Sequence, residues 1–190
     1  IYLGCNPAIA HVPAVLGGTC LMFHDSEPTP IREMLFRPFA DVILTPEGFE
    51  NDLGRKQLRY PGYHELAYLH PERFDPDANK LREYGIDPDE NYYVLRFIAW
   101  GAHHDAGQSG LSIEGKRTLV SELSEHGIVY ITAEDELPEE FEEHRLPVPP
   151  HLMHHLLSYA NMYVGDSQTM ATEAAVLGTP SIRCNSFVGD

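Results

Sequence analysis

Residues 162–180 constrain the fold more than any other stretch, because they carry in succession the signals for a strand, a tight turn, a helix and a helix stop. A short apolar run ends at Gly165, which predicts a strand followed by a turn. Ser167 or Thr169 can cap the next helix, and Gly178 before a proline predicts its end. A helix that begins at the carboxyl end of a strand presents free backbone N–H groups and the positive end of its dipole. The stretch therefore predicts an anion-binding site.

One carboxylate in this stretch suits the ligand that such a site would hold. Glu173 lies about one turn inside the predicted helix, where it can accept hydrogen bonds from hydroxyl groups beside the anion. We expect Ser167, Gln168 and Thr169 to bind phosphate through backbone N–H groups and hydroxyls, and Glu173 to bind ribose. The alternatives are N-capping alone at the turn and a plain surface glutamate on the helix. Phosphate on a helix tip with ribose on a carboxylate is a nucleotide arrangement.

Strand and helix signals alternate along the chain. Strand-length apolar runs occur at residues 19–23, 41–45, 92–98, 128–132, 162–164 and 181–184. Amphipathic helices are expected between them, which predicts an α/β fold with parallel sheets. Residues 46–71 lack this periodicity and are rich in glycine and proline. We therefore predict two Rossmann-like domains, at residues 1–60 and 73–190, joined by a crossing at 61–72, with the ligand in the cleft between them.

Composition limits the partners. The 190 residues include 13 basic and 29 acidic side chains, a net charge of −16, and no local basic patch. Such a chain repels nucleic acid and anionic membrane surfaces. No apolar run is long enough to span a bilayer, and the separated Cys5, Cys20 and Cys184 are expected to be buried reduced thiols. We expect a cytoplasmic protein with no nucleic-acid partner and no transmembrane segment.

Polar residues near the predicted strand ends are the candidates for chemistry. Arg96 lies in an otherwise apolar strand, where it would bind a diphosphate or pair with a carboxylate. His103 and His104 follow on a glycine-containing loop. There a neutral histidine could act as a general base, or a protonated one could neutralise a leaving diphosphate. Asp25 and Glu27 follow an earlier strand and are candidates to deprotonate an acceptor hydroxyl.

Two further groups are expected to be structural. His151 and His155 are four residues apart, a spacing that can hold zinc on one helix face, but no third ligand of known register follows them. We therefore predict no metal site and no cofactor. The second group, in the predicted crossing, is Tyr63, His64, Glu65 and Tyr68. These residues could form a hinge and touch the ligand as the domains close, but packing of the linker is the preferred interpretation.

The turn and helix that contain Ser167 and Glu173, followed by residues 177–180, resemble the donor-binding signature of GT-B glycosyltransferases and UDP-N-acetylglucosamine 2-epimerases. In the epimerases two glycines stand where this chain has Gln168 and Thr169. A resemblance over most of the chain is to domain-of-unknown-function family 354. It is carried by residues 39–46, 60–68, Arg96 with 99–102, and the closing turn with Glu173.

That family is thought to have the GT-B architecture, and its reaction is not established. The resemblance implies a metal-independent glycosyltransferase that binds a nucleotide-sugar donor, preferably a UDP-sugar, and a sugar or lipid-linked acceptor, as in polysaccharide biosynthesis. A 2-epimerase-like isomerase and a non-catalytic nucleotide-sugar-binding protein are the alternatives, and a homodimer is left open. Because the chain begins at Ile1 in an apparent strand end and stops at Asp190 just after another strand, we expect both domains to be incomplete.

Overall fold

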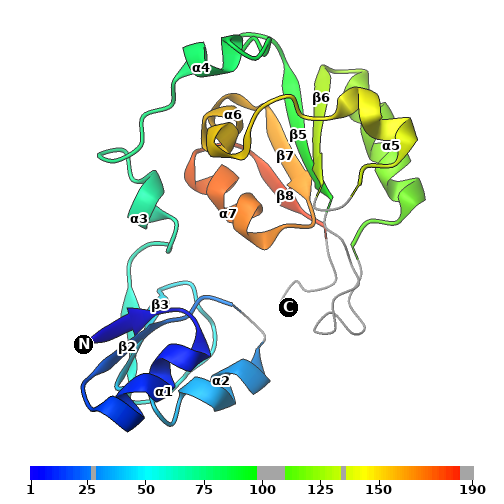
Figure 1. Cartoon of the computed structure of the whole chain (residues 1–190). Coiled ribbons are helices and arrows are strands. Elements are labelled where there is room, and N and C mark those ends of the chain that lie inside the picture. Colours follow the sequence, from blue (N-terminus) through cyan, green and yellow to red (C-terminus); the bar gives the residue numbers. More distant parts are fainter. Residues whose placement is uncertain (27–28, 98–109, 134–135, 185–190) are drawn as a thin grey trace. The chain divides into compact units, whose positions relative to one another are not determined.

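The chain folds into two compact units. The structure, a computed structural model, describes residues 1–26, 29–97, 110–133 and 136–184. The first unit comprises residues Ile1–Ala67, and the second begins at Tyr68. The division lies within residues 61–72, where the predicted crossing was placed. Each unit contains one parallel sheet of four strands (Figure 1).

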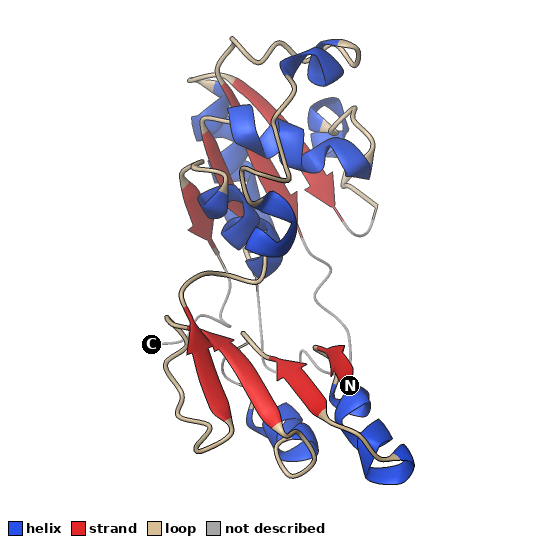
Figure 2. Ribbon diagram, turned by 90° about the vertical axis from the view of Figure 1, so that its left-hand side faces the viewer, coloured by secondary structure: helices blue, strands red, loops and turns tan. Residues whose placement is uncertain are grey.

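The first unit is a parallel sheet with two helices on one face (Figure 2). Its strands are arranged in the order β1-β2-β3-β4. The elements are β1 (Tyr2–Gly4), α1 (Pro7–Leu16), β2 (Cys20–Phe23), α2 (Pro30–Phe36), β3 (Val42–Pro46) and β4 (Gln57–Tyr60). The core lies between the helices and the sheet, where Ala10 and Phe36 pack against Cys20, Met22 and Ile43.

The strand register separates two sets of side chains in this sheet. Met22 and Ile43 are register partners and lie on the helix face, whereas Phe23 alternates with Met22 and therefore lies on the opposite face. On that opposite face Leu3 and Leu58 are 56% and 57% exposed. The opposite face of the first sheet is thus much less covered than the helix face.

The second unit is covered on both faces of its sheet. Its strands are arranged in the order β6-β5-β7-β8, all parallel. Its elements are α4 (Ala78–Arg82), β5 (Tyr92–Phe97), α5 (Ile113–Ser124), β6 (Ile128–Ala133), η1 (Glu139–His144), η2 (Pro150–Leu152), α6 (Met153–Tyr159), β7 (Met162–Gly165), α7 (Gln168–Val176) and β8 (Ser181–Arg183), with α3 (Leu66–Leu69) across the boundary between the units.

Two cores occupy the two faces of this sheet. In Figure 1, α6 and α7 lie on one side of the sheet and α5 on the other. Tyr92, Val94 and Tyr163 belong to the core under α6 and α7, whereas Leu95 and Val164 belong to the core under α5 and η1. This division follows from the two-residue period of strands that are buried on both sides.

The strand order creates a topological switch point. The chain passes from β5 to β6 on one side and later adds β7 on the other side of β5. Helices that follow β5 and β7 therefore leave the sheet in different directions, and a crevice forms outside the carboxyl ends of these two strands. Arg96 of β5 and Gly165 of β7 are register partners at this place.

The predicted α/β class with parallel sheets is confirmed, and two local expectations are not. Strand β4 lies in the stretch for which no regular structure was predicted. Cys5 is exposed and only Cys20 is fully buried, although all three cysteines are free thiols. Among the described helices, none has the length and apolar character needed to cross a membrane.

Candidate functional site

Arg96 lies at the switch point, near the carboxyl end of the central strand β5. Its strand neighbours on the same face, Tyr92 and Val94, are buried in the apolar core, so the guanidinium emerges where that core ends. Nη1 donates a hydrogen bond to Thr132 Oγ1 at 2.9 Å, on the neighbouring strand β6. The arginine is therefore held in place by β6 while its strand position directs it to the crevice.

The turn between β7 and α7 approaches the backbone of Arg96 closely. The Asp166 N–H donates to the Arg96 carbonyl at 3.1 Å. Of the two candidate caps, Ser167 is the one used, since its Oγ accepts from the Met170 N–H at 3.3 Å. Among the described residues, no acceptor is found for the N–H groups of Gln168 and Thr169. Two donors therefore remain at the predicted helix tip.

Glu173 is a buried residue, so the alternative of a plain surface glutamate is wrong. It is 8% exposed. Tyr68 donates its hydroxyl to Glu173 Oε1 at 2.9 Å, and His154 Nε2 lies 3.1 Å from the same oxygen. No hydrogen bond or ion pair to Oε2 is found among the described residues. The carboxylate is thus fixed through one oxygen, and the other is available.

A pocket of about 450 Å³ brings several of these residues together. It lies on the α6 and α7 face of the second sheet, with Arg96 and Thr132 from the strands and Met170 and Glu173 from α7. The remaining lining residues come from β6 and the approach to α6, namely Ile131, Ala133, Arg145, Leu146, Val148, Pro150, Met153 and His154. Its volume falls within the range of about 300–1,000 Å³ that small-molecule sites occupy.

Two arginine side chains line this pocket, although the chain as a whole is strongly acidic. Arg96 and Arg145 line it, and among the described lining residues Glu173 contributes the single carboxylate. Arg145 is already paired with Glu142, whose two oxygens lie 2.7 and 2.5 Å from its guanidinium nitrogens. Arg96 contributes a second guanidinium to the pocket, from near the carboxyl end of β5. A cation on the wall of a pocket favours an anionic ligand.

The structure unites only part of the predicted nucleotide site. Arg96 and Glu173 line one pocket, with Val148 beside them. Ser167, Gln168 and Thr169 are not among the residues that line it, although Met170 in the next position is. The helix tip is connected to the pocket through its short backbone contact with Arg96.

Asp25, the candidate base of the first unit, has a partner that the sequence did not indicate. Its Oδ2 lies 2.6 Å from His64 Nδ1. The hydrogen bond with His64 holds the pKa of the Asp25 carboxyl below its usual value, with a smaller contribution from the Ser26 hydroxyl 3.2 Å away. His64 was expected to pack the linker, and only its contact with Asp25 across 39 positions shows otherwise.

Three of the predicted residues lie outside the described part of the chain: Glu27, His103 and His104. His155 is buried and accepts a hydrogen bond from the Asp77 N–H at 3.0 Å, so it supports the start of α4. Within the described ranges, no group of three or more histidine, cysteine or acidic side chains is arranged to hold a metal ion.

Comparison of the chain with models of known protein families gives no match, and comparison with curated proteins gives none either.

Proposed function

We propose that this chain is a nucleotide-sugar-dependent glycosyltransferase-like protein whose second unit binds the donor, preferably a UDP-sugar. We also propose that the two units are Rossmann-like domains of the GT-B kind. The observation that carries the proposal is the pocket at the switch point, which presents the Arg96 guanidinium and the Glu173 carboxylate to the same space. Open α/β sheets hold their ligands at this position.

The anionic part of the donor is assigned to Arg96 and the start of α7. Arg96 supplies a full positive charge. The N–H groups of Gln168 and Thr169, for which the described part of the chain offers no acceptor, supply further donors at the positive end of the α7 dipole. A diphosphate that leaves a sugar gains negative charge, and fixed donors of this kind stabilise it without a metal ion.

The nucleoside is assigned to the rest of the pocket. Glu173 has one oxygen held by Tyr68 and His154, so Oε2 can accept a ribose hydroxyl without a large rearrangement. Val148 and Pro150 line the same pocket and provide apolar surface for the base. Cation, carboxylate and apolar surface thus match the three chemical parts of a nucleoside diphosphate.

Calorimetric titration of the whole chain with UDP and UDP-N-acetylglucosamine tests the proposal. Glu173→Gln removes the charge and retains the shape, and we expect its affinity to fall about 10-fold or more, because a hydrogen bond to a charged group contributes about 1.5–3 kcal/mol. Glu125→Gln, at an exposed glutamate that ends α5, is the matched control and should bind like the parent. Equal affinities of the two variants would refute the ribose assignment.

Two further measurements separate the proposed reaction from its alternatives. Affinity that is unchanged by a chelator supports metal-independent binding. Incubation of UDP-N-acetylglucosamine in deuterated water, followed by analysis of the sugar C2, detects epimerisation. Tight nucleotide binding with no turnover of any donor would instead indicate a binding protein.

A further inference from the structure

The two helices of the first unit have apolar side chains on the side that faces away from the sheet. Ala10 of α1 and Phe36 of α2 point to the sheet and are fully buried. Five large apolar side chains of α1, α2 and the turn that follows are instead well exposed, namely Val15 (84%), Ile31 (77%), Met34 (75%), Leu35 (50%) and Phe39 (45%). A helix on a sheet normally presents its polar side to water. These two helices present the reverse.

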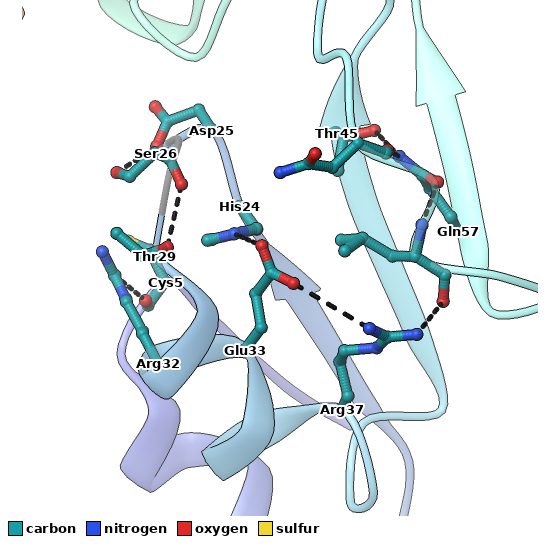
Figure 3. A network of polar contacts seen from close by, with 12 residues as sticks. Cys5, His24, Asp25, Ser26, Thr29, Arg32, Glu33, Arg37, Thr45 and Gln57 are labelled. Atoms are coloured by element: carbon teal, nitrogen blue, oxygen red, sulfur yellow. Dashed lines mark hydrogen bonds and ion pairs between the residues drawn. The ribbon is translucent and has the colours of Figure 1, made fainter. Parts of the chain in front are cut away.

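The charged residues of these helices do not interrupt the apolar side. Helix α1 contains no acidic or basic residue other than one histidine. In α2, Arg32 donates from Nη2 to the Cys5 carbonyl at 2.6 Å, and Glu33 is buried (Figure 3). Arg37, which ends α2, donates to the Leu53 carbonyl at 3.3 Å. The charged groups are thus buried or bonded to backbone, and the outer side of the two helices is left to apolar side chains.

His11 joins the two helices into one surface. Its Nε2 lies 2.7 Å from the Leu35 carbonyl oxygen, and its ring centroid lies 4.5 Å from that of Phe39. Val15 follows His11 by one turn on the same side of α1, and Leu35 follows Ile31 by one turn on the same side of α2. The five exposed apolar side chains therefore form one surface with His11, which we call the α1–α2 patch.

The α1–α2 patch is large enough to form an interface. If a large side chain has on the order of 200 Å² of surface, the exposed parts of the five apolar members present roughly 600–700 Å². The largest apolar patch on a typical monomer is about 300–600 Å², and such patches often mark an interaction site. Two α1–α2 patches in contact would bury more than the roughly 1,000 Å² that a specific interface requires.

The distribution of charge favours a second copy of this chain as the partner. Residues 1–67 hold 8 of the 29 acidic and 5 of the 13 basic side chains, so their net charge is −3 and that of residues 68–190 is −13. Two copies that meet through the α1–α2 patch bring together the parts of the chain that repel each other least. A bilayer is a poorer partner, because helices that lie on membranes carry lysine and arginine along their polar side, and α1 has neither.

We propose that the chain forms a twofold symmetric homodimer through the α1–α2 patch. In such a contact the same patch is used by both copies, so α1 and α2 pack against the same helices of the partner. Burial of apolar surface drives the association, and ion pairs do not. Added salt should therefore strengthen the dimer, because it screens the repulsion between the two acidic chains. The proposal does not depend on nucleotide binding by the second unit.

Sedimentation velocity of the whole chain over a wide range of concentrations tests the proposal, with a reductant present because Cys5 is an exposed thiol. We expect an equilibrium between monomer and dimer whose dissociation constant falls as salt is added. Ile31→Glu should raise that constant about 100-fold or more, because a symmetric contact contains the buried charge twice. The new carboxylate lies in the first turn of α2, where the helix dipole favours it, and circular dichroism checks that the fold is retained.

Ile113→Glu is the matched control, since this isoleucine is partly exposed in the first turn of α5, outside the patch, and the variant should dimerise like the parent. Met34→Glu, within the patch, should weaken the dimer as Ile31→Glu does. A monomer at every concentration overturns the proposal, and so does a dimer that neither patch variant weakens. Flotation with phosphatidylcholine vesicles tests the other partner: vesicle binding that Ile31→Glu abolishes, without a dimer, would assign the patch to a membrane and overturn the proposal.

Discussion

Tyr68 donates a hydrogen bond to Oε1 of Glu173 at 2.9 Å, although 105 positions separate the two residues in the chain. His154 contacts the same oxygen from the first turn of α6. The phenol and the imidazole together orient a buried carboxylate whose other oxygen has no partner among the described residues. Pre-orientation of this kind lowers the entropic cost of binding a ligand.

Tyr68→Phe should lower both the stability of the second unit and its affinity for UDP. We expect the free energy of unfolding to fall by about 1 kcal/mol, the usual net contribution of one hydrogen bond. We expect UDP affinity to fall several-fold, because the Glu173 carboxylate gains freedom to rotate. Urea denaturation and calorimetry measure the two effects, with the partly exposed Tyr84→Phe as control. Parent-like values for both quantities would show that the phenol does not orient Glu173.

Arg96 and Arg145 line the same pocket but should contribute unequally. Arg145 forms a two-point ion pair with Glu142, whereas Arg96 lies at the carboxyl end of β5, with its Nη1 donating to Thr132 Oγ1 and its carbonyl accepting from the Asp166 N–H. We expect Arg96→Met to lower UDP affinity about 10-fold or more, and Arg145→Met to lower it less than about threefold. Titrations with UDP at two salt concentrations measure the affinity of each variant. The affinities of the parent and of Arg145→Met should depend more steeply on salt than the affinity of Arg96→Met. Equal losses in the two variants would contradict the assignment of the diphosphate to Arg96.

Gly165 should not tolerate a side chain. A Cβ at this position would lie 2.5 Å from the Arg96 carbonyl oxygen and 2.8 Å from the Tyr163 hydroxyl oxygen. The added Cβ of Gly165→Ala must push β5 and β7 apart. We expect the free energy of unfolding to fall by about 1–3 kcal/mol, which is typical of overpacking. Gly115→Ala in α5 is the control, since its Cβ would meet nothing closer than 3.4 Å. It should be neutral or stabilising, by up to about 1 kcal/mol.

His24 should make the first unit sensitive to acid. Its side chain is fully buried between Phe36 and Phe49, with Nε2 3.6 Å from Glu33 Oε1 (Figure 3). Burial lowers the pKa of His24 below 6.5, the Arg32 charge adds to this, and Glu33 and Asp25 oppose it. The folded state therefore binds the proton less readily than the unfolded state. The contribution of His24 to the free energy of unfolding is fully present above pH 6.5 and decreases as the pH falls below that value.

Urea denaturation between pH 7.5 and 5 measures this effect. The limiting slope for one proton is about 1.4 kcal/mol per pH unit. We expect His24→Leu to be less stable than the parent at pH 7.5 but to lose less stability on acidification. His126→Leu, at an exposed histidine, should retain the parent slope. Identical slopes in the parent and His24→Leu would assign the acid sensitivity to other groups.

Much of the local structure could be predicted because it depends on neighbouring residues. The cap at Ser167 and the helix end before Gly178, whose φ is +89°, follow from side chains and backbone conformations within a few positions. The alternation of strands and helices, and hence the α/β class, follows from periodicity over ten to twenty residues. Strand β4 was missed because two of its four residues are exposed and its pattern is too short to recognise.

The sequence by itself determined most of the elements, the capped α7 helix, and the presence of Arg96 as a polar residue in an apolar strand. Only the tertiary structure decided the strand order, which places Arg96 at a switch point, and the pairs Asp25–His64 and Tyr68–Glu173. These contacts join residues 39 and 105 positions apart. Local propensity acts over a few residues, whereas such pairs exist only after burial of apolar surface has brought distant segments together.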